Sequence, residues 1–150
     1  MRTAKDIMTS PAITIGPDAD ITEAAKILLD RDINGLPVVD DSGRVVGIIC
    51  QSDLVRMQKS LPIPSLFTLL DGFVPLSTTA LLETEVKRIA ASKVADAMTR
   101  KVEFISPDTG VDIIATLMVD KQFHTLPVVD QGRLVGVVGK RDILRTLLPR

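Results

Sequence analysis

The chain contains an internal duplication, and this feature constrains its fold more than any other. Matching segments lie 90 positions apart at first and 89 apart after a one-residue deletion. They include MT at 8–9 and 98–99, LPVVD at 36–40 and 126–130, and the single residues Asp53 and Asp142. A series of matches in the same order indicates that one structural unit occurs twice in the chain.

Each copy carries the apolar spacing of an amphipathic helix. Apolar residues recur at positions i, i+3, i+4 and i+7 in both copies, namely at Ile21, Ala24, Ala25 and Leu28 and at Val111, Ile114, Ala115 and Met118. This period predicts a helix with one buried face. Asp20, with Glu23 three residues later, also predicts a capping box at the start of the first helix.

Short β-prone segments surround each of these helices. Residues 12–15 and 102–105 precede the helix, and two apolar runs that flank an Asp/Gly turn follow it. Such runs predict a β-hairpin, and a second helix is expected to begin near Ser52 and Arg141. Each copy is then a βαββα unit that is too small to bury its own sheet. We therefore expect an α/β (α+β) fold in which the two units pack sheet to sheet around a shared core.

A segment without a counterpart separates the two copies. We divide the chain into repeat 1 at 1–58, an apolar and helical insert at 59–93, and repeat 2 at 94–150. The insert is unusually apolar between residues 66 and 74, and its end, 82–91, is expected to be helical. Packing against the repeats or against a second copy of the chain explains such a segment. A role at a membrane surface or as a ligand lid is the alternative.

Composition restricts the partners and the compartment. Lys and Arg total 18 against 19 Asp and Glu, and the formal net charge of -1 gives no reason to expect a nucleic-acid partner. One cysteine and one histidine exclude an intramolecular disulfide and argue against a metal site. Prolines interrupt the apolar region at 61–82, so no membrane span is expected. Because no signal peptide is evident, the sequence predicts a cytoplasmic protein.

An aspartate at the start of the second helix of each copy is the strongest candidate for binding chemistry. Asp53 and Asp142 each follow a strand glycine, Gly47 or Gly136, by six residues. An ionised carboxylate can accept hydrogen bonds from two neighbouring hydroxyls, such as a ribose diol. The N–H groups of a helix start suit phosphate. The alternative is that each aspartate only caps its helix, and the occurrence in both copies favours a binding role.

Basic residues near the second aspartate favour an anionic ligand there. Lys140 and Arg141 precede it, whereas Gln51 and Ser52 precede the first aspartate. Lys and Arg bind phosphate through charge-assisted hydrogen bonds, and a solvated surface pair is the competing interpretation. His124, in a loop, is a further phosphate donor or pH sensor, or else an incidental residue.

The sequence lacks the parts of an enzyme. It contains neither a G-x-S-x-G elbow, nor HExxH, nor a Walker loop, nor a paired cysteine motif. Cys50 ends a buried apolar run with no neighbour that lowers its pKa, so we interpret it as a packing residue and not as a nucleophile. We therefore expect a binding protein without catalytic residues.

The ordered set of motifs resembles a tandem pair of CBS domains, or Bateman module, in a stand-alone protein of the bacterial or archaeal type. The motifs are Asp-x-Met-Thr, Pro-Asp, LPVVD, Gly-Arg-x-Val-Gly and the closing aspartate, and they cover about residues 4–56 and 94–145. The resemblance implies a pseudo-two-fold pair of repeats that forms a homodimer. It also implies a regulatory adenosine-containing ligand (AMP, ADP, ATP or S-adenosylmethionine) in clefts between the repeats, with no other cofactor required.

The resemblance assigns candidate nucleotide-binding residues. Asp53 and Asp142 would hold the ribose hydroxyls, and Ser52, Lys140 and Arg141 would lie on the ribose–phosphate side. The base and the pocket edge would be lined by Thr14, Ile15, Phe104, Ile105, Leu36, Pro37, Leu126 and Pro127. Members of the family often carry Thr or Ser three residues before the aspartate, where this chain has Cys50 and Gly139.

Two functions remain open at this point. The first is a ligand sensor in which a nucleotide changes the packing of the repeats and signals through self-association or a separate regulated protein. The second is a structural dimerisation or scaffold module without nucleotide, which the missing hydroxyls favour. For a sensor we expect clefts of unequal affinity, with the Asp142 cleft preferring a phosphate-bearing ligand.

Overall fold

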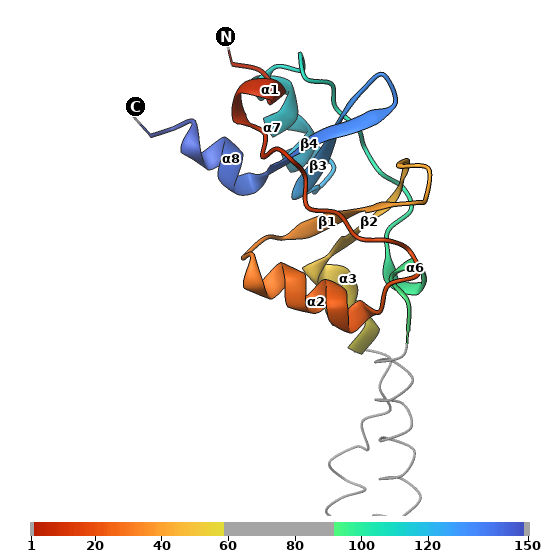
Figure 1. Cartoon of the computed structure of the whole chain (residues 1–150). Helices are drawn as coiled ribbons and strands as arrows, with labels where there is room; N and C mark the ends of the chain where they lie inside the picture. The colour runs from red at the N-terminus through yellow and green to blue at the C-terminus, as the bar shows by residue number, and fades with distance from the viewer. Residues whose placement is uncertain (1, 59–91, 149–150) are drawn as a thin grey trace, which may run out of the picture.

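The computed structural model describes residues 2–58 and 92–148, which form two similar halves (Figure 1). The first half contains α1 (Ala4–Ile7), α2 (Ile21–Asp30), β1 (Gly35–Val39), β2 (Val45–Cys50) and α3 (Gln51–Gln58). The second half contains α6 (Val94–Ala97), α7 (Val111–Asp120), β3 (Thr125–Asp130), β4 (Arg133–Gly139) and α8 (Lys140–Arg145). This order confirms the predicted fold class. The helix expected at 82–91 lies outside the described residues.

Each half is built on an antiparallel β-hairpin, and the two hairpins differ in their turns. In the second hairpin Asp130 pairs with Arg133. The two residues between them, Gln131 and Gly132, have φ angles of 51° and 79°, as a type I′ turn requires. The first hairpin has a longer turn, and this accounts for the change of offset from 90 to 89 in the sequence.

The longer turn of the first hairpin is organised by one carboxylate. Asp40 Oδ1 accepts hydrogen bonds from the N–H groups of Ser42 (2.9 Å) and Arg44 (3.0 Å) and from the Ser42 hydroxyl (2.6 Å). These bonds, above all that of the Ser42 hydroxyl, hold the pKa of Asp40 below its usual value. Gly43 completes the turn at a φ of 84°, where a residue without a side chain is favoured.

The first strand expected in each unit is reduced to a single parallel bridge. Ile15 donates its N–H to the Pro37 carbonyl (3.1 Å) and accepts a bond from the Val39 N–H (2.9 Å). The next bond on either side would need a donor from Pro37 or Pro17, which have no N–H. The second half repeats this bridge at Ile105. In both halves, prolines therefore limit the pairing of the first predicted strand to a single bridge.

The helices α2 and α7 confirm the predicted amphipathic helices, with Ile21, Ala24 and Leu28 buried in the first of them. The capping box predicted at the start of α2 is wrong. The Asp20 side chain makes no capping hydrogen bond and instead pairs with Lys93 Nζ at 2.7 Å. A backbone bridge between Asp20 and Lys93 brings the ammonium group of Lys93 next to the Asp20 carboxylate. The carboxylate therefore binds this cation and not the neutral N–H groups at the helix start.

The start of each copy packs against the other copy. Thr9 bridges β4, and Thr99 bridges β2, so α1 lies beside the second half and α6 beside the first (Figure 1). A Cβ atom on Gly47 would lie 2.9 Å from the Thr99 carbonyl oxygen, and one on Gly136 would lie 3.0 Å from that of Thr9. The two strand glycines therefore leave room for the crossing backbone.

Each half has its own hydrophobic core, which the crossing segment of the other half completes. Ala4 of α1 is fully buried in the second core, and Val94 of α6 is fully buried in the first. The hairpins meet where β1 contacts β3, and a Cβ atom on Gly35 would lie 2.9 Å from Thr125 Oγ1. The two repeats therefore depend on each other for their packing.

Candidate functional site

Asp53 and Asp142 occupy equivalent positions in the first turns of α3 and α8. Oδ2 of Asp53 accepts a hydrogen bond from the Cys50 N–H, and Oδ2 of Asp142 accepts one from the Gly139 N–H, both at 2.8 Å. Both carboxylates therefore satisfy a backbone donor at the helix start. Both residues are buried, with exposed fractions of 3% and 8%, and Oδ1 of each does not take part in this capping bond.

The remaining oxygen, Oδ1, distinguishes the two aspartates. Oδ1 of Asp53 accepts hydrogen bonds from Thr99 Oγ1 at 2.9 Å and from Arg56 at 3.4 Å. Oδ1 of Asp142 accepts only the bond from Arg145, at 3.3 Å, among residues 2–58 and 92–148. Thr9, the counterpart of Thr99, does not bind it. Asp142 therefore keeps an unused acceptor site, whereas the protein itself fills that site on Asp53.

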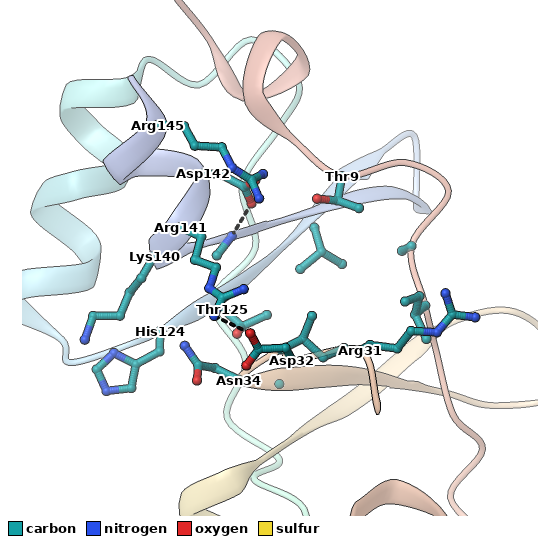
Figure 2. Close-up of a pocket in the computed structure, with 16 residues that line it drawn as sticks. Thr9, Arg31, Asp32, Asn34, His124, Thr125, Lys140, Arg141, Asp142 and Arg145 are labelled. Atoms are coloured by element: carbon teal, nitrogen blue, oxygen red, sulfur yellow. Dashed lines mark hydrogen bonds and ion pairs between the residues drawn. The ribbon is translucent and has the colours of Figure 1, made fainter. Parts of the chain in front are cut away.

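A cleft lies in front of Asp142 and is lined by both halves of the molecule (Figure 2). Figure 2 shows Lys140, Arg141 and Arg145 on the side of α8, with Thr9 and Asp32 of the first half facing them. The lining residues are Thr9, Ala12, Ile13, Arg31, Asp32, Ile33, Asn34, Gly35, His124, Thr125, Val137, Gly139, Lys140, Arg141, Asp142 and Arg145.

The cleft carries an excess of positive charge. Its lining includes four side chains that are cationic at neutral pH, Arg31, Lys140, Arg141 and Arg145, against the two carboxylates Asp32 and Asp142. The corresponding positions around Asp53 hold two cations, Arg56 and Lys121, and two carboxylates, Asp53 and Glu103. The Asp142 cleft therefore favours an anion more strongly than the equivalent region around Asp53.

The structure brings together four of the predicted nucleotide-binding residues. His124, Lys140, Arg141 and Asp142 all line the cleft. Ser52, which is exposed, belongs with Asp53 to the equivalent region of the first half.

The other candidates are not part of this lining. Ile15 and Ile105 are buried in the two cores, Thr14 is half-buried and Phe104 is exposed. Four further candidates are buried within β1 and β3: Leu36, Pro37, Leu126 and Pro127. Their contact with a base stays a prediction.

Several lining residues were missed by the sequence reasoning because they come from the opposite copy. Arg31, Asp32 and Asn34 follow α2 of the first half, yet they face α8 of the second. Nothing in the local sequence around Asp142 points to them. Arg145 carried a signal, because Arg56 and Arg145 each follow the aspartate by three residues in both copies.

Cys50 is a half-buried thiol at the end of β2. Burial, with a smaller contribution from the negative charge of Asp53, raises the pKa of Cys50 to about 12. The thiolate is therefore scarce at neutral pH, which agrees with the interpretation of Cys50 as a packing residue.

Residues 2–58 and 92–148 contain no group of three or more His, Cys, Asp or Glu side chains placed to hold a metal ion. No helix in the same part of the chain is both long and apolar enough to cross a membrane.

The fold and the cleft define a class of protein made of two interlocked βαββα repeats with a ligand-sized cleft between them. Comparison with known families identifies it further, because a family model of the CBS domain matches residues 4–60 and 94–149. The chain therefore belongs to the CBS domain family and carries the domain twice, as the resemblance predicted.

Three relatives illustrate the similarity. The uncharacterized protein MJ1426 of Methanocaldococcus jannaschii is 35% identical over 96% of this chain and 90% of its own length. The solved CBS domain of a CBS domain containing membrane protein from Sphaerobacter thermophilus is 33% identical, with a TM-score of 0.71 over 100% of this chain and 90% of that one. Some relatives are longer: the chain spans only 42% of a second protein of Methanocaldococcus jannaschii, MJ1225.

A further relative was solved as a complex. It is the CBS domain pair of protein MJ0100 with 5'-methylthioadenosine and S-adenosyl-L-methionine. The chain is 31% identical to it, with a TM-score of 0.71 over 97% of this chain and 95% of that one. Pairs of this family thus include one that holds adenosine-containing molecules.

Proposed function

We propose that this protein is a regulatory module that binds an adenosine-containing, phosphate-bearing ligand in the Asp142 cleft. One observation carries the proposal. A buried carboxylate with an unused acceptor site lies in one cleft with four cationic side chains, between two repeats that interlock. Such a site can hold hydroxyls and an anion in one molecule, and its occupancy can alter how the repeats pack.

Each part of an adenine nucleotide has a partner in the cleft. Oδ1 of Asp142 accepts hydrogen bonds from the ribose hydroxyls, and Lys140 and Arg141 bind the phosphate. His124 is a further donor at the phosphate end. Apolar side chains for the base come from the opposite wall and from β4: Ala12, Ile13, Ile33 and Val137. The complex of the MJ0100 domain pair supports the adenosine part of this assignment, and the charge of the cleft supports the phosphate.

The region around Asp53 is proposed as a second, weaker site. Ser52 and Asp53 would approach a ligand there, but Oδ1 of Asp53 already binds Thr99 and Arg56. A ligand must displace the Thr99 hydroxyl before it can use the carboxylate. We therefore expect AMP, ADP or ATP to fill the Asp142 cleft first.

Regulation requires an output, and self-association is the output we propose. Four large apolar side chains are strongly exposed on the helices at positions that the duplication relates, Leu29 (76%) with Val119 (75%) and Val55 (67%) with Leu144 (60%). Apolar surface of this kind is a common site of protein contact. Equivalent patches on both repeats suit a closed homodimer in the cytoplasm, through which a separate regulated protein would read the ligand.

Thermal unfolding of the full chain with AMP, ADP, ATP, S-adenosylmethionine and adenosine tests the proposal. A ligand at about 100 times its Kd adds about 2.7 kcal/mol to the stability of the folded state. For a chain of this size the Tm rises by roughly 5–10 °C. The absence of any shift with all five compounds contradicts the proposal. A dimer that persists without any such shift supports the alternative, a structural dimerisation module.

A further inference from the structure

An ion pair crosses the mouth of the Asp142 cleft and joins the two repeats. Nη2 of Arg141, in α8, lies 2.5 Å from Oδ2 of Asp32, which follows α2 of the other half. Figure 2 shows this pair between the two walls of the cleft. Both side chains are largely exposed, and the duplication places uncharged residues, Gln122 and Ser52, at the equivalent positions. The ion pair is therefore a feature of one cleft alone.

The backbone fixes Asp32 in place at the end of α2. The Ile33 N–H binds the Leu28 carbonyl at 3.1 Å, and the Asp32 N–H binds the Leu29 carbonyl at 3.3 Å. These two bonds form a Schellman motif, in which the residue after the helix adopts a left-handed conformation. Asp32 has the corresponding φ of 52°. Its carboxylate is therefore held at the mouth of the cleft by the fold of the helix end and not by the ion pair.

The choice of aspartate at this position is unfavourable for the helix. A left-handed residue after a helix is usually glycine, and a negative charge at a helix C-terminus interacts unfavourably with the helix dipole. Local structure therefore does not explain Asp32. Its bond to Arg141 is the interaction that the carboxylate adds.

We propose that Asp32 is an internal competitor of the ligand phosphate. While no anion is present, its carboxylate occupies Arg141. The phosphate of a ligand binds the Arg141 guanidinium in place of Asp32. The ion pair then separates, and one contact between the repeats is lost. Asp32 thus lowers the affinity for phosphate and couples ligand binding to the packing of the two halves. This inference rests on the proposed function and adds the residue that sets the preference for phosphate.

The charges make this exchange favourable. Phosphate presents more negative charge and more acceptor oxygens to the guanidinium group of Arg141 than one carboxylate does. Asp32 is exposed, so water solvates its carboxylate once it is released, and exposed ion pairs contribute little to stability. Lys140 and Arg31, which also line the cleft, add to the attraction for phosphate and not for a neutral nucleoside.

Titration calorimetry with AMP and with adenosine on the full chain tests the inference. Asp32→Asn removes the negative charge and keeps the size of the side chain. Asparagine also tolerates the left-handed conformation of this position. We expect this variant to bind AMP about five- to tenfold more tightly and to leave the affinity for adenosine within about twofold, with the gain reduced at high salt. Gln122→Asn places the same residue at the equivalent helix end, which carries no charge to remove, and is expected to leave both affinities unchanged.

A double-mutant cycle with Arg141→Ala shows whether Asp32 acts through Arg141. In that background the gain from Asp32→Asn should shrink. Weaker AMP binding by Asp32→Asn, or an equal change for AMP and adenosine, overturns the inference while the proposed function survives. Failure of the wild type and of Asp32→Asn to bind AMP, ADP, ATP, S-adenosylmethionine or adenosine overturns both. Binding of AMP by Asp32→Asn alone would support a competitor strong enough to block the cleft.

Discussion

The regions around Asp53 and Asp142 have the same backbone and different chemistry. In both, the aspartate caps the helix through one oxygen and meets an arginine three residues later through the other. Around Asp53, however, Thr99 donates a further bond to the carboxylate, and the nearby charges balance. Around Asp142 that acceptor site is unused, and cations outnumber carboxylates. The comparison shows that both copies keep the same scaffold, while a few side chains give the Asp142 cleft an excess of positive charge and a carboxylate with an unused acceptor site.

The largest difference is expected in thiol chemistry at the position three residues before each aspartate. Cys50 occupies that position in the first half, and its pKa of about 12 leaves little thiolate at pH 8. Gly139 occupies it in the second half and lines the cleft. A thiol placed there by Gly139→Cys, with Cys50→Ala, should react with iodoacetamide about 100- to 1,000-fold faster than Cys50 does.

Measurement of the alkylation rate between pH 7 and pH 10 checks this difference. The rate at Cys50 should continue to rise up to pH 10, because its pKa of about 12 lies above this range and the thiolate fraction still increases with pH. Equal rates at the two positions would mean that the clefts do not differ in access.

The second prediction concerns affinity and compares the two aspartates directly. Asp142→Asn should weaken the binding of AMP by about 100-fold, because an amide replaces the charged acceptor of two hydroxyl bonds. Asn also caps a helix well, so the fold is retained. Asp53→Asn is the matched control and should change the affinity of the tighter site by less than about threefold. Calorimetry measures both, and a larger loss in Asp53→Asn would reverse the assignment of the sites.

These two regions also show what the sequence could and could not predict. The repeats, the helices and the hairpins follow from local periodicity and turn residues, and the two aspartates stand out because both copies contain them. The wall of the cleft formed by Arg31, Asp32 and Asn34 depends on how one repeat packs on the other. That packing is set by crossing segments that lie 51 (Ile48 and Thr99) and 128 (Thr9 and Val137) positions from the strand residues they bridge, and no local pattern encodes it. The capping box at Asp20 failed for the same reason, since its competitor Lys93 is distant in sequence.

The third prediction concerns the free energy of unfolding and compares two threonines. Thr99→Val removes the hydroxyl that binds buried Asp53, which should cost about 1–2 kcal/mol. Thr9→Val removes the equivalent hydroxyl, which makes no bond to Asp142 within residues 2–58 and 92–148. It should change the stability by less than about 0.5 kcal/mol. Denaturant unfolding of both variants checks the comparison, and equal losses would show that the two carboxylates are satisfied alike.

The smallest effect is expected from restoring a hydroxyl to each cleft. A Cβ atom on Gly139 would lie 3.7 Å from the His124 carbonyl oxygen and 3.9 Å from Asp142 Oδ2, so a serine fits without strain. One added hydrogen bond contributes about 0.5–1.5 kcal/mol, so Gly139→Ser should tighten AMP binding by about three- to tenfold.

Cys50→Ser is the matched change in the first half, and it should leave the tight site unaffected because Cys50 does not line it. Tightening by both substitutions would mean that the clefts are equally open to ligand. Weaker binding by Gly139→Ser would mean that the ligand approaches this glycine too closely for a side chain. In that case the glycine, and not a lost hydroxyl, would be what makes the Asp142 cleft the better site.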